Sequence, residues 1–204
     1  MKKFKKTISL ILCLTMILTM FALPADAAVY YLNSYNTGSQ MQETDTWCWA
    51  ASAVNAVLFR KGHAANYFNR SNQESAVYAA TGSYTYSGVG YLADIDEAAT
   101  YAAGGSYTYT PSNSSANWDE IVSYIMRNKA VIAGGGKYSG STRTGGHIFM
   151  IFKVDTTNEL VYFVDPWISF TTETARRKYC TYDEFMAGCS ATMQYQHDCA
   201  VYQN

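Results

Sequence analysis

The chain has 204 residues, of which 49% are hydrophobic and 15% are charged, and its formal net charge is −1. This length and apolar content predict one globular domain and exclude a disordered or fibrous chain. Because 15 basic residues are balanced by 16 acidic ones, the chain lacks the strongly basic field of a typical nucleic-acid-binding protein, and we expect no nucleic-acid partner.

Residues 1–27 have the pattern of a secretory signal peptide. Four lysines between positions 2 and 6 precede an apolar run over 8–23, and Ala25-Asp26-Ala27 matches a small-x-small cleavage site. An uncleaved membrane anchor is the alternative, but this run is short for a spanning helix. We therefore expect cleavage after Ala27, which leaves residues 28–204 as one secreted, monomeric domain of a bacterial protein with no membrane segment.

The first half of this domain is predicted to be mainly helical. The segment 47–60 is rich in Ala and free of Gly and Pro, with Asp45 or Thr46 available as N-cap and Gly62 as its end. Ser71 and Asn117 are each followed three residues later by Glu, as in a capping box. The expected helices are 47–60, 71–82, 91–103, 117–128 and a short one at 182–186.

The second half is predicted to form strands. The runs 130–133, 147–154 and 160–164 are rich in β-branched and aromatic residues, and a polar turn at 155–158 joins the last two as an antiparallel hairpin. Further strands are expected at 170–174 and 193–202, and the Gly-rich segment 134–146 is expected to be a mobile loop. Helices followed by an antiparallel sheet define an α+β fold.

Four cysteines remain after signal cleavage, namely Cys48, Cys180, Cys189 and Cys199. In an oxidising environment the three C-terminal ones predict one disulfide and a spare thiol. A zinc site that includes His197 is the alternative, but the spacing fits no common closed zinc site. We expect no metal and no cofactor.

Cys48 is the candidate nucleophile because it lies in the first turn of the predicted helix 47–60. Backbone N–H groups and the helix dipole favour an ionised thiol at such a position. Gln42, on the preceding loop, is placed to donate its amide to an oxyanion together with the Cys48 N–H. The alternative is that Cys48 is a small buried hydrophobe on an Ala-rich face.

His147 is the candidate base for this thiol. It follows Gly145-Gly146 and opens the predicted strand 147–154, whereas His63 and His197 are expected to be ordinary surface or core residues. Asp165 ends the partner strand of the hairpin, so it is placed to orient His147. Trp167 is placed to cover the hydrogen bond between them, and simple core packing is the alternative role of this indole.

Gln42, Cys48-Trp49, Gly146-His147 and an acidic residue followed by Trp167 resemble, in this order, the papain-like cysteine peptidases. The string from Trp47 to Ala51 and Asp165-Pro166 are most similar to the AvrRpt2-type branch (peptidase C70), with the peptidase C39-like proteins as neighbours. The resemblance spans roughly 40–170. It implies a helical half that carries the nucleophile, a sheet half that carries the base, and a protein or peptide substrate in the cleft between them.

Within that resemblance, Trp49, Gly145, Gly146 and Trp167 are expected to contact the substrate. The orienting residue is Asp165, whereas papains usually have Asn. Two other functions stay open: a Cys/His amidase that acts on cell-wall peptides, and an inactive secreted binding protein that uses the Tyr-rich segments 84–91 and 101–109 as a stacking surface.

Overall fold

The computed structural model describes residues 27–64 and 70–204. The predicted signal peptide therefore lies outside the described residues, apart from Ala27. No helix in the described part of the chain has the length and apolar character needed to cross a membrane.

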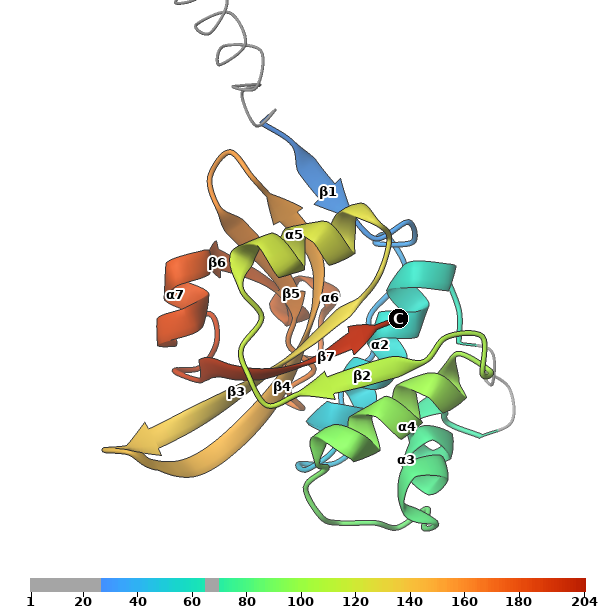
Figure 1. The fold of residues 1–204 in the computed structure, drawn as a ribbon. Helices are drawn as coiled ribbons and strands as arrows, with labels where there is room; N and C mark the ends of the chain where they lie inside the picture. Colours follow the sequence, from blue (N-terminus) through green and yellow to red (C-terminus); the bar gives the residue numbers. More distant parts are fainter. Residues whose placement is uncertain (1–26, 65–69) are drawn as a thin grey trace, which may run out of the picture.

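One antiparallel sheet forms the centre of the domain (Figure 1). Six strands follow the order β2-β7-β3-β4-β5-β6, and β1 pairs with β4 beyond the end of β3. The strands are β1 (Val29–Tyr31), β2 (Tyr109–Ser112), β3 (Val131–Ser139), β4 (Thr142–Asp155), β5 (Leu160–Val164), β6 (Arg177–Thr181) and β7 (Gln196–Gln203).

Helices cover the sheet and extend one end of it. The helices α2, α3 and α4 gather into a helical lobe, while α5 and α7 lie against the strands (Figure 1). The helices are α2 (Cys48–Lys61), α3 (Asn72–Thr81), α4 (Leu92–Ala102), α5 (Trp118–Met126), α6 (Glu173–Arg176) and α7 (Tyr182–Ala187). The predicted α+β fold, with a helical first half and an antiparallel second half, is confirmed.

The helix α2 is the central helix of the domain. Its side chains from Trp49 to Phe59 are buried, because it packs on β4 on one side and on α3 and α4 on the other. The hydroxyl of Ser52 donates to the carbonyl of Ile148 at 3.1 Å and thereby ties the helix to β4. This contact fixes the start of α2 relative to the strand that carries His147.

The predicted helix ends are mostly confirmed. Gly62 and Gly82 end α2 and α3 in the left-handed conformation, with φ of 84° and 73°. Ser71 caps α3, and Asn117 forms a capping box at α5. The N-cap expected at Asp45 or Thr46 is wrong, since the residues before α2 form a turn and Trp47 is the N-cap without a side-chain bond.

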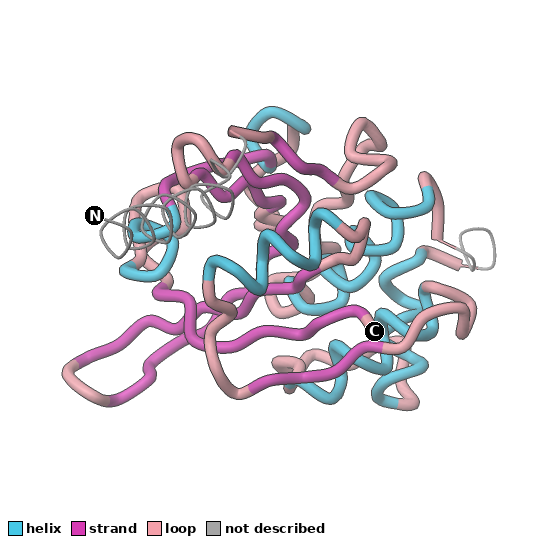
Figure 2. Tube along the Cα trace, turned by 45° about the horizontal axis from the view of Figure 1, so that its top comes forward, coloured by secondary structure: helices cyan, strands magenta, loops and turns pink. Residues whose placement is uncertain are grey.

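Two predictions for the second half of the chain, one of a loop and one of a strand, are also wrong. The segment 134–146 is not a loop but most of the β3–β4 hairpin, which projects from the sheet (Figures 1 and 2). A Cβ added at Gly134 would lie 2.3 Å from Cys199 Sγ, so the glycines make room for β7 side chains inside a sheet. The strand expected at 170–174 is absent there, because Thr172 caps α6 and β6 follows it.

Candidate active site

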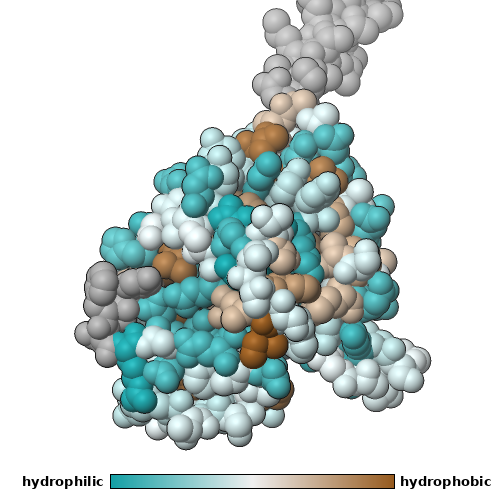
Figure 3. Space-filling model, turned by 180° about the vertical axis from the view of Figure 1, so that it is seen from behind, coloured by the Kyte–Doolittle hydropathy of each residue, from teal (hydrophilic) through white to brown (hydrophobic). Residues whose placement is uncertain are grey.

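Cys48 is the first residue of α2, as the sequence predicts. Its side chain is half-buried and faces a cleft between the helical lobe and the β3–β4 hairpin. The cleft has a volume of about 680 Å³. From behind, the molecule is hollowed between this lobe and the hairpin (Figure 3).

His147 and Asp165 lie side by side under the cleft. The nitrogen Nε2 of His147 is 2.7 Å from Oδ1 of Asp165, and the two side chains are 1% and 0% exposed. At this end of the β4–β5 ladder the last paired residues are Met150 and Val164. His147 and Asp165 therefore both lie just beyond the same end of the ladder. The expected proximity is confirmed, but His147 does not open its strand, because β4 begins at Thr142.

The second partner of His147 is the Cys48 side chain, which forms a hydrogen bond with the ring. Since Asp165 occupies Nε2, the nitrogen that remains for the sulfur is Nδ1. Burial of the ring by itself lowers the His147 pKa, but the hydrogen bonds and negative charges of Asp165 and Cys48 outweigh it and raise the pKa to about 9. The imidazole is therefore held as an imidazolium at neutral pH.

Aromatic rings enclose the imidazole. Trp167 and Phe149 meet it edge-on, with ring centroids 5.7 and 4.8 Å away, and Tyr195 lies at 5.4 Å. The Trp167 backbone N–H also donates to Asp165 Oδ1 at 3.1 Å. These contacts limit the access of water to the bond between His147 and Asp165, as expected for Trp167.

Lys178 is a site residue that the sequence reasoning missed. Its Nζ donates to Oδ2 of Asp165 at 3.1 Å, from strand β6 next to β5. Asp165 thus accepts from the imidazole, from the Trp167 N–H and from an ammonium group. The sequence signal was weak, because Lys178 follows two arginines and reads as part of a charged surface strand.

The two walls of the cleft come from different halves of the fold. Residues 89–92 and Ile95 form the helical wall, and Tyr138 with residues 143–148 forms the sheet wall. The four predicted substrate-contact residues Trp49, Gly145, Gly146 and Trp167 all line the cleft. The wall at 89–92 was not predicted as such, although Tyr91 belongs to the first Tyr-rich segment.

Gln42 is fully buried at the start of α2. Its Nε2 donates to the Thr44 carbonyl at 2.8 Å, and this same carbonyl accepts from the Trp47 N–H at 3.2 Å. The side-chain amide therefore lies beside the residue that precedes Cys48. One amide hydrogen is used by Thr44, and neither the second hydrogen nor Oε1 has a partner among the described residues. Gln42 is not one of the residues that line the cleft.

The remaining cysteines and His197 do not form a metal site. Both ring nitrogens of His197 are used, one by the Gly134 carbonyl at 2.9 Å and one by the Ala116 N–H at 2.8 Å. In residues 27–64 and 70–204 no cluster of three or more metal-ligating side chains occurs. The predicted disulfide is not formed in the structure, since Cys180, Cys189 and Cys199 are all free thiols. The Cys180 and Cys189 thiols form a hydrogen bond with each other, while Cys199 lines the cleft.

The chain has relatives among known proteins. A family model described as "Peptidase_C39 like family" matches residues 32–196. No curated protein matches the chain.

Two solved structures share its fold. The peptidase domain of Streptococcus ComA, a bi-functional ABC transporter, is 10% identical over 82% of this chain and 97% of that chain, with a TM-score of 0.50. Xylellain, a cysteine protease from Xylella fastidiosa, is 11% identical over 87% of each chain, with a TM-score of 0.54. The fold is therefore papain-like, as the sequence resemblance implies.

Proposed function

This chain belongs to the Peptidase_C39 like family and is a cysteine-type peptidase, and from that premise we propose that it is a secreted enzyme that cleaves proteins or peptides with Cys48 as nucleophile. His147 is the acid and base of the reaction. Asp165 orients His147, and Gln42 stabilises the oxyanion.

The observation that carries this proposal is the double contact of His147. Asp165 bonds one ring nitrogen at 2.7 Å, and the Cys48 thiol bonds the ring as well. An imidazolium that persists to about pH 9 lies beside the Cys48 sulfur, and a thiolate is the reactive form of cysteine.

The reaction begins when the Cys48 sulfur attacks the carbonyl carbon of a peptide bond in the cleft. The new C–S bond moves an electron pair to the carbonyl oxygen, which becomes an oxyanion near the first turn of α2. The Cys48 backbone N–H and the free amide hydrogen of Gln42 are the proposed donors to this oxygen.

The C–N bond then breaks, and His147 gives its proton to the leaving amine. This step leaves an acyl group on Cys48 and a neutral imidazole held in place by Asp165. The imidazole next takes a proton from water, and the resulting hydroxide attacks the acyl carbon. Release of the acid restores the thiolate and the imidazolium.

Export is proposed from the sequence pattern of residues 1–27, and the cleavage site that it predicts lies next to Ala28. The Ala28 N–H donates to Thr156 Oγ1 at 3.0 Å, and the Ala28 carbonyl accepts from the Thr156 N–H at 2.9 Å. The first residue after the predicted cleavage site is therefore bound to the domain. Cleavage after Ala27 leaves these contacts intact.

Comparison of Cys48→Ala with a second cleft thiol variant tests the proposed function. Wild type, Cys48→Ala and Cys199→Ala are each incubated with proteome-derived peptides and with purified peptidoglycan, and new termini are identified by mass spectrometry. We expect cleavage of peptides by wild type and Cys199→Ala and none by Cys48→Ala. Equal profiles for wild type and Cys48→Ala contradict the proposal, and turnover of peptidoglycan alone favours an amidase.

A further inference from the structure

The segment that carries Gln42 belongs to no strand or helix. Residues 40–43, which we name the Gln42 strap, have no helical or strand assignment although Gln42 is buried. Backbone groups in such a place need partners from side chains or from distant backbone. The partners of the strap therefore determine where the Gln42 amide sits.

One side of the strap is bound to α2 and to the end of the sheet. The Asn55 carboxamide on α2 accepts from the Gln40 N–H at 2.7 Å and donates to the Gln40 carbonyl at 2.9 Å. The Gln42 N–H donates to the Pro166 carbonyl at 2.7 Å. The strap is thus tied to the helix of Cys48 and to the residue that follows Asp165.

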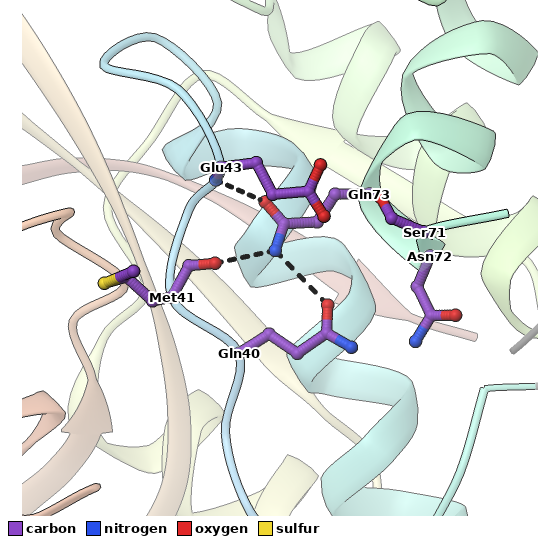
Figure 4. Close-up of a pocket in the computed structure, with 6 residues that line it drawn as sticks. All are labelled: Gln40, Met41, Glu43, Ser71, Asn72 and Gln73. Carbon is purple, nitrogen blue, oxygen red and sulfur yellow. Dashed lines mark hydrogen bonds between the residues drawn. The ribbon is translucent and has the colours of Figure 1, made fainter. Parts of the chain in front are cut away.

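The other side is bound by a single side chain, that of Gln73 on α3. Its Nε2 donates to Gln40 Oε1 at 3.2 Å. It also donates to the Met41 carbonyl at 2.7 Å, and Oε1 accepts from the Glu43 N–H at 3.0 Å (Figure 4). These two groups belong to the two peptide units that flank Gln42. The Gln73 carboxamide therefore takes the place of a neighbouring strand.

The Gln73 side chain is buried next to open space. Its side chain is 1% exposed and lines a pocket of about 380 Å³, together with the strap residues Gln40, Met41 and Glu43 and with Ser71 and Asn72 (Figure 4). Without Gln73 the strap keeps its bonds to Asn55 and Pro166, but the stretch from Met41 to Glu43 has space next to it in which to shift. Gln73 does not line the cleft that holds Cys48, and the pocket shares no lining residue with that cleft.

We propose that Gln73 is a positioning residue that holds the Gln42 amide where it can donate a hydrogen bond to the oxyanion formed at Cys48. This inference rests on the proposed function, in which Gln42 is an oxyanion donor. Gln73 itself touches no reacting atom. It acts through the two peptide units on either side of Gln42.

Because an oxyanion donor acts on the transition state, a displaced Gln42 lowers kcat more than it changes KM. A displacement of about 1 Å costs on the order of a hundredfold in rate when it misaligns a catalytic group. For Gln73→Met, which keeps the length of the side chain but removes its three hydrogen bonds to the strap, we expect kcat to fall by about tenfold to a hundredfold.

The test measures three quantities for wild type and Gln73→Met, namely kcat, KM and the rate at which iodoacetamide alkylates Cys48. The substrate is the peptide that wild type cleaves fastest in the proteome-derived set. Alkylation forms no oxyanion, so its rate is expected to stay within about twofold while kcat falls. Ser71→Ala is the matched control, since Ser71 caps the same helix end but does not touch the strap. It is expected to lower the melting temperature and to leave kcat unchanged.

A second variant keeps the test valid if Gln73→Met does not fold. Gln73→Glu retains the acceptor for the Glu43 N–H and loses the donor to the Met41 carbonyl and to Gln40 Oε1, so an intermediate loss of kcat is expected. A loss of alkylation in parallel with kcat, in either variant, contradicts a positioning role and indicates general disorder of the site.

A double-mutant cycle separates this inference from the proposed function. If Gln73 acts through Gln42, Gln73→Met has no further effect on kcat in a Gln42→Ala background. Equal losses in both backgrounds overturn the inference and leave the oxyanion role of Gln42 standing. An unchanged kcat in Gln42→Ala itself refutes that role, and the inference falls with it.

Discussion

Replacement of Asp165 by Asn removes one negative charge from beside His147 and keeps the size of the side chain. The wild-type imidazolium persists to about pH 9 because Asp165 and Cys48 outweigh the effect of burial. A raised pKa means that the charged form is complete at low pH and is lost as the pH rises through the pKa. Activity that needs the imidazolium is therefore lost at the alkaline end.

The size of the effect follows from the geometry of the pair. The Nε2–Oδ1 distance is 2.7 Å, and both side chains are almost fully buried, so solvent screening is weak. Two unit charges about 4 Å apart at an effective dielectric constant of about 20 interact by about 4 kcal/mol. At about 1.4 kcal/mol per pH unit, the His147 pKa falls by about three pH units, from about 9 to about 6. The Lys178 ammonium, left without its carboxylate, lowers it further.

The assay is kcat/KM against pH from 5 to 10, with the peptide cleaved fastest by wild type. The alkaline limb is expected near pH 9 in wild type and about three pH units lower in Asp165→Asn. Lys178→Met is the control of opposite sign, since it removes a cation and moves the limb upward. An alkaline limb that stays in place in Asp165→Asn refutes the argument.

We also expect Asp165→Ala to retain more turnover than Cys48→Ala or His147→Ala, whose side chains make and break bonds.

Three further predictions concern the surroundings of the site. Trp167→Ala removes one edge-on ring contact with His147, which is worth about 0.5–1.5 kcal/mol. It is expected to lower kcat/KM about two- to tenfold. An unchanged kcat/KM shows that water does not compete for the hydrogen bond between His147 and Asp165. Peptide mapping of the exported protein without reductant is expected to find Cys180 linked to Cys189, because their thiols already touch; both thiols alkylated under these conditions contradict it. N-terminal sequencing of the exported protein is expected to begin at Ala28, and a start elsewhere contradicts cleavage after Ala27.

The sequence predicted those parts of the site that depend on local patterns and chain order. Cys48 opens a helix because the Ala-rich segment after it has no breaker, and an antiparallel hairpin brings His147 close to Asp165. Both features follow from propensity and strand pairing, which are readable along the chain. The same holds for the capped helix ends at Ser71 and Asn117.

The missed features depend on contacts between segments far apart in the chain. A run of three glycines usually indicates a loop, but here it forms strand β3 because side chains of β7 fill the space above it. Lys178 reaches Asp165 from the next strand, and Gln73 reaches the Gln42 strap from another helix. Neither pairing leaves a local pattern in the sequence.

The rate of Cys48 alkylation by iodoacetamide at pH 6, measured in wild type and in His147→Ala, tests the central claim most directly. Mass spectrometry assigns the label, and Cys199 serves as the internal reference, because burial raises its pKa to about 12 and keeps it unreactive. We predict rapid labelling of Cys48 in wild type and at least about a tenfold slower rate in His147→Ala. Equal rates in the two proteins, or labelling of Cys199 before Cys48, would contradict an ion pair between Cys48 and His147.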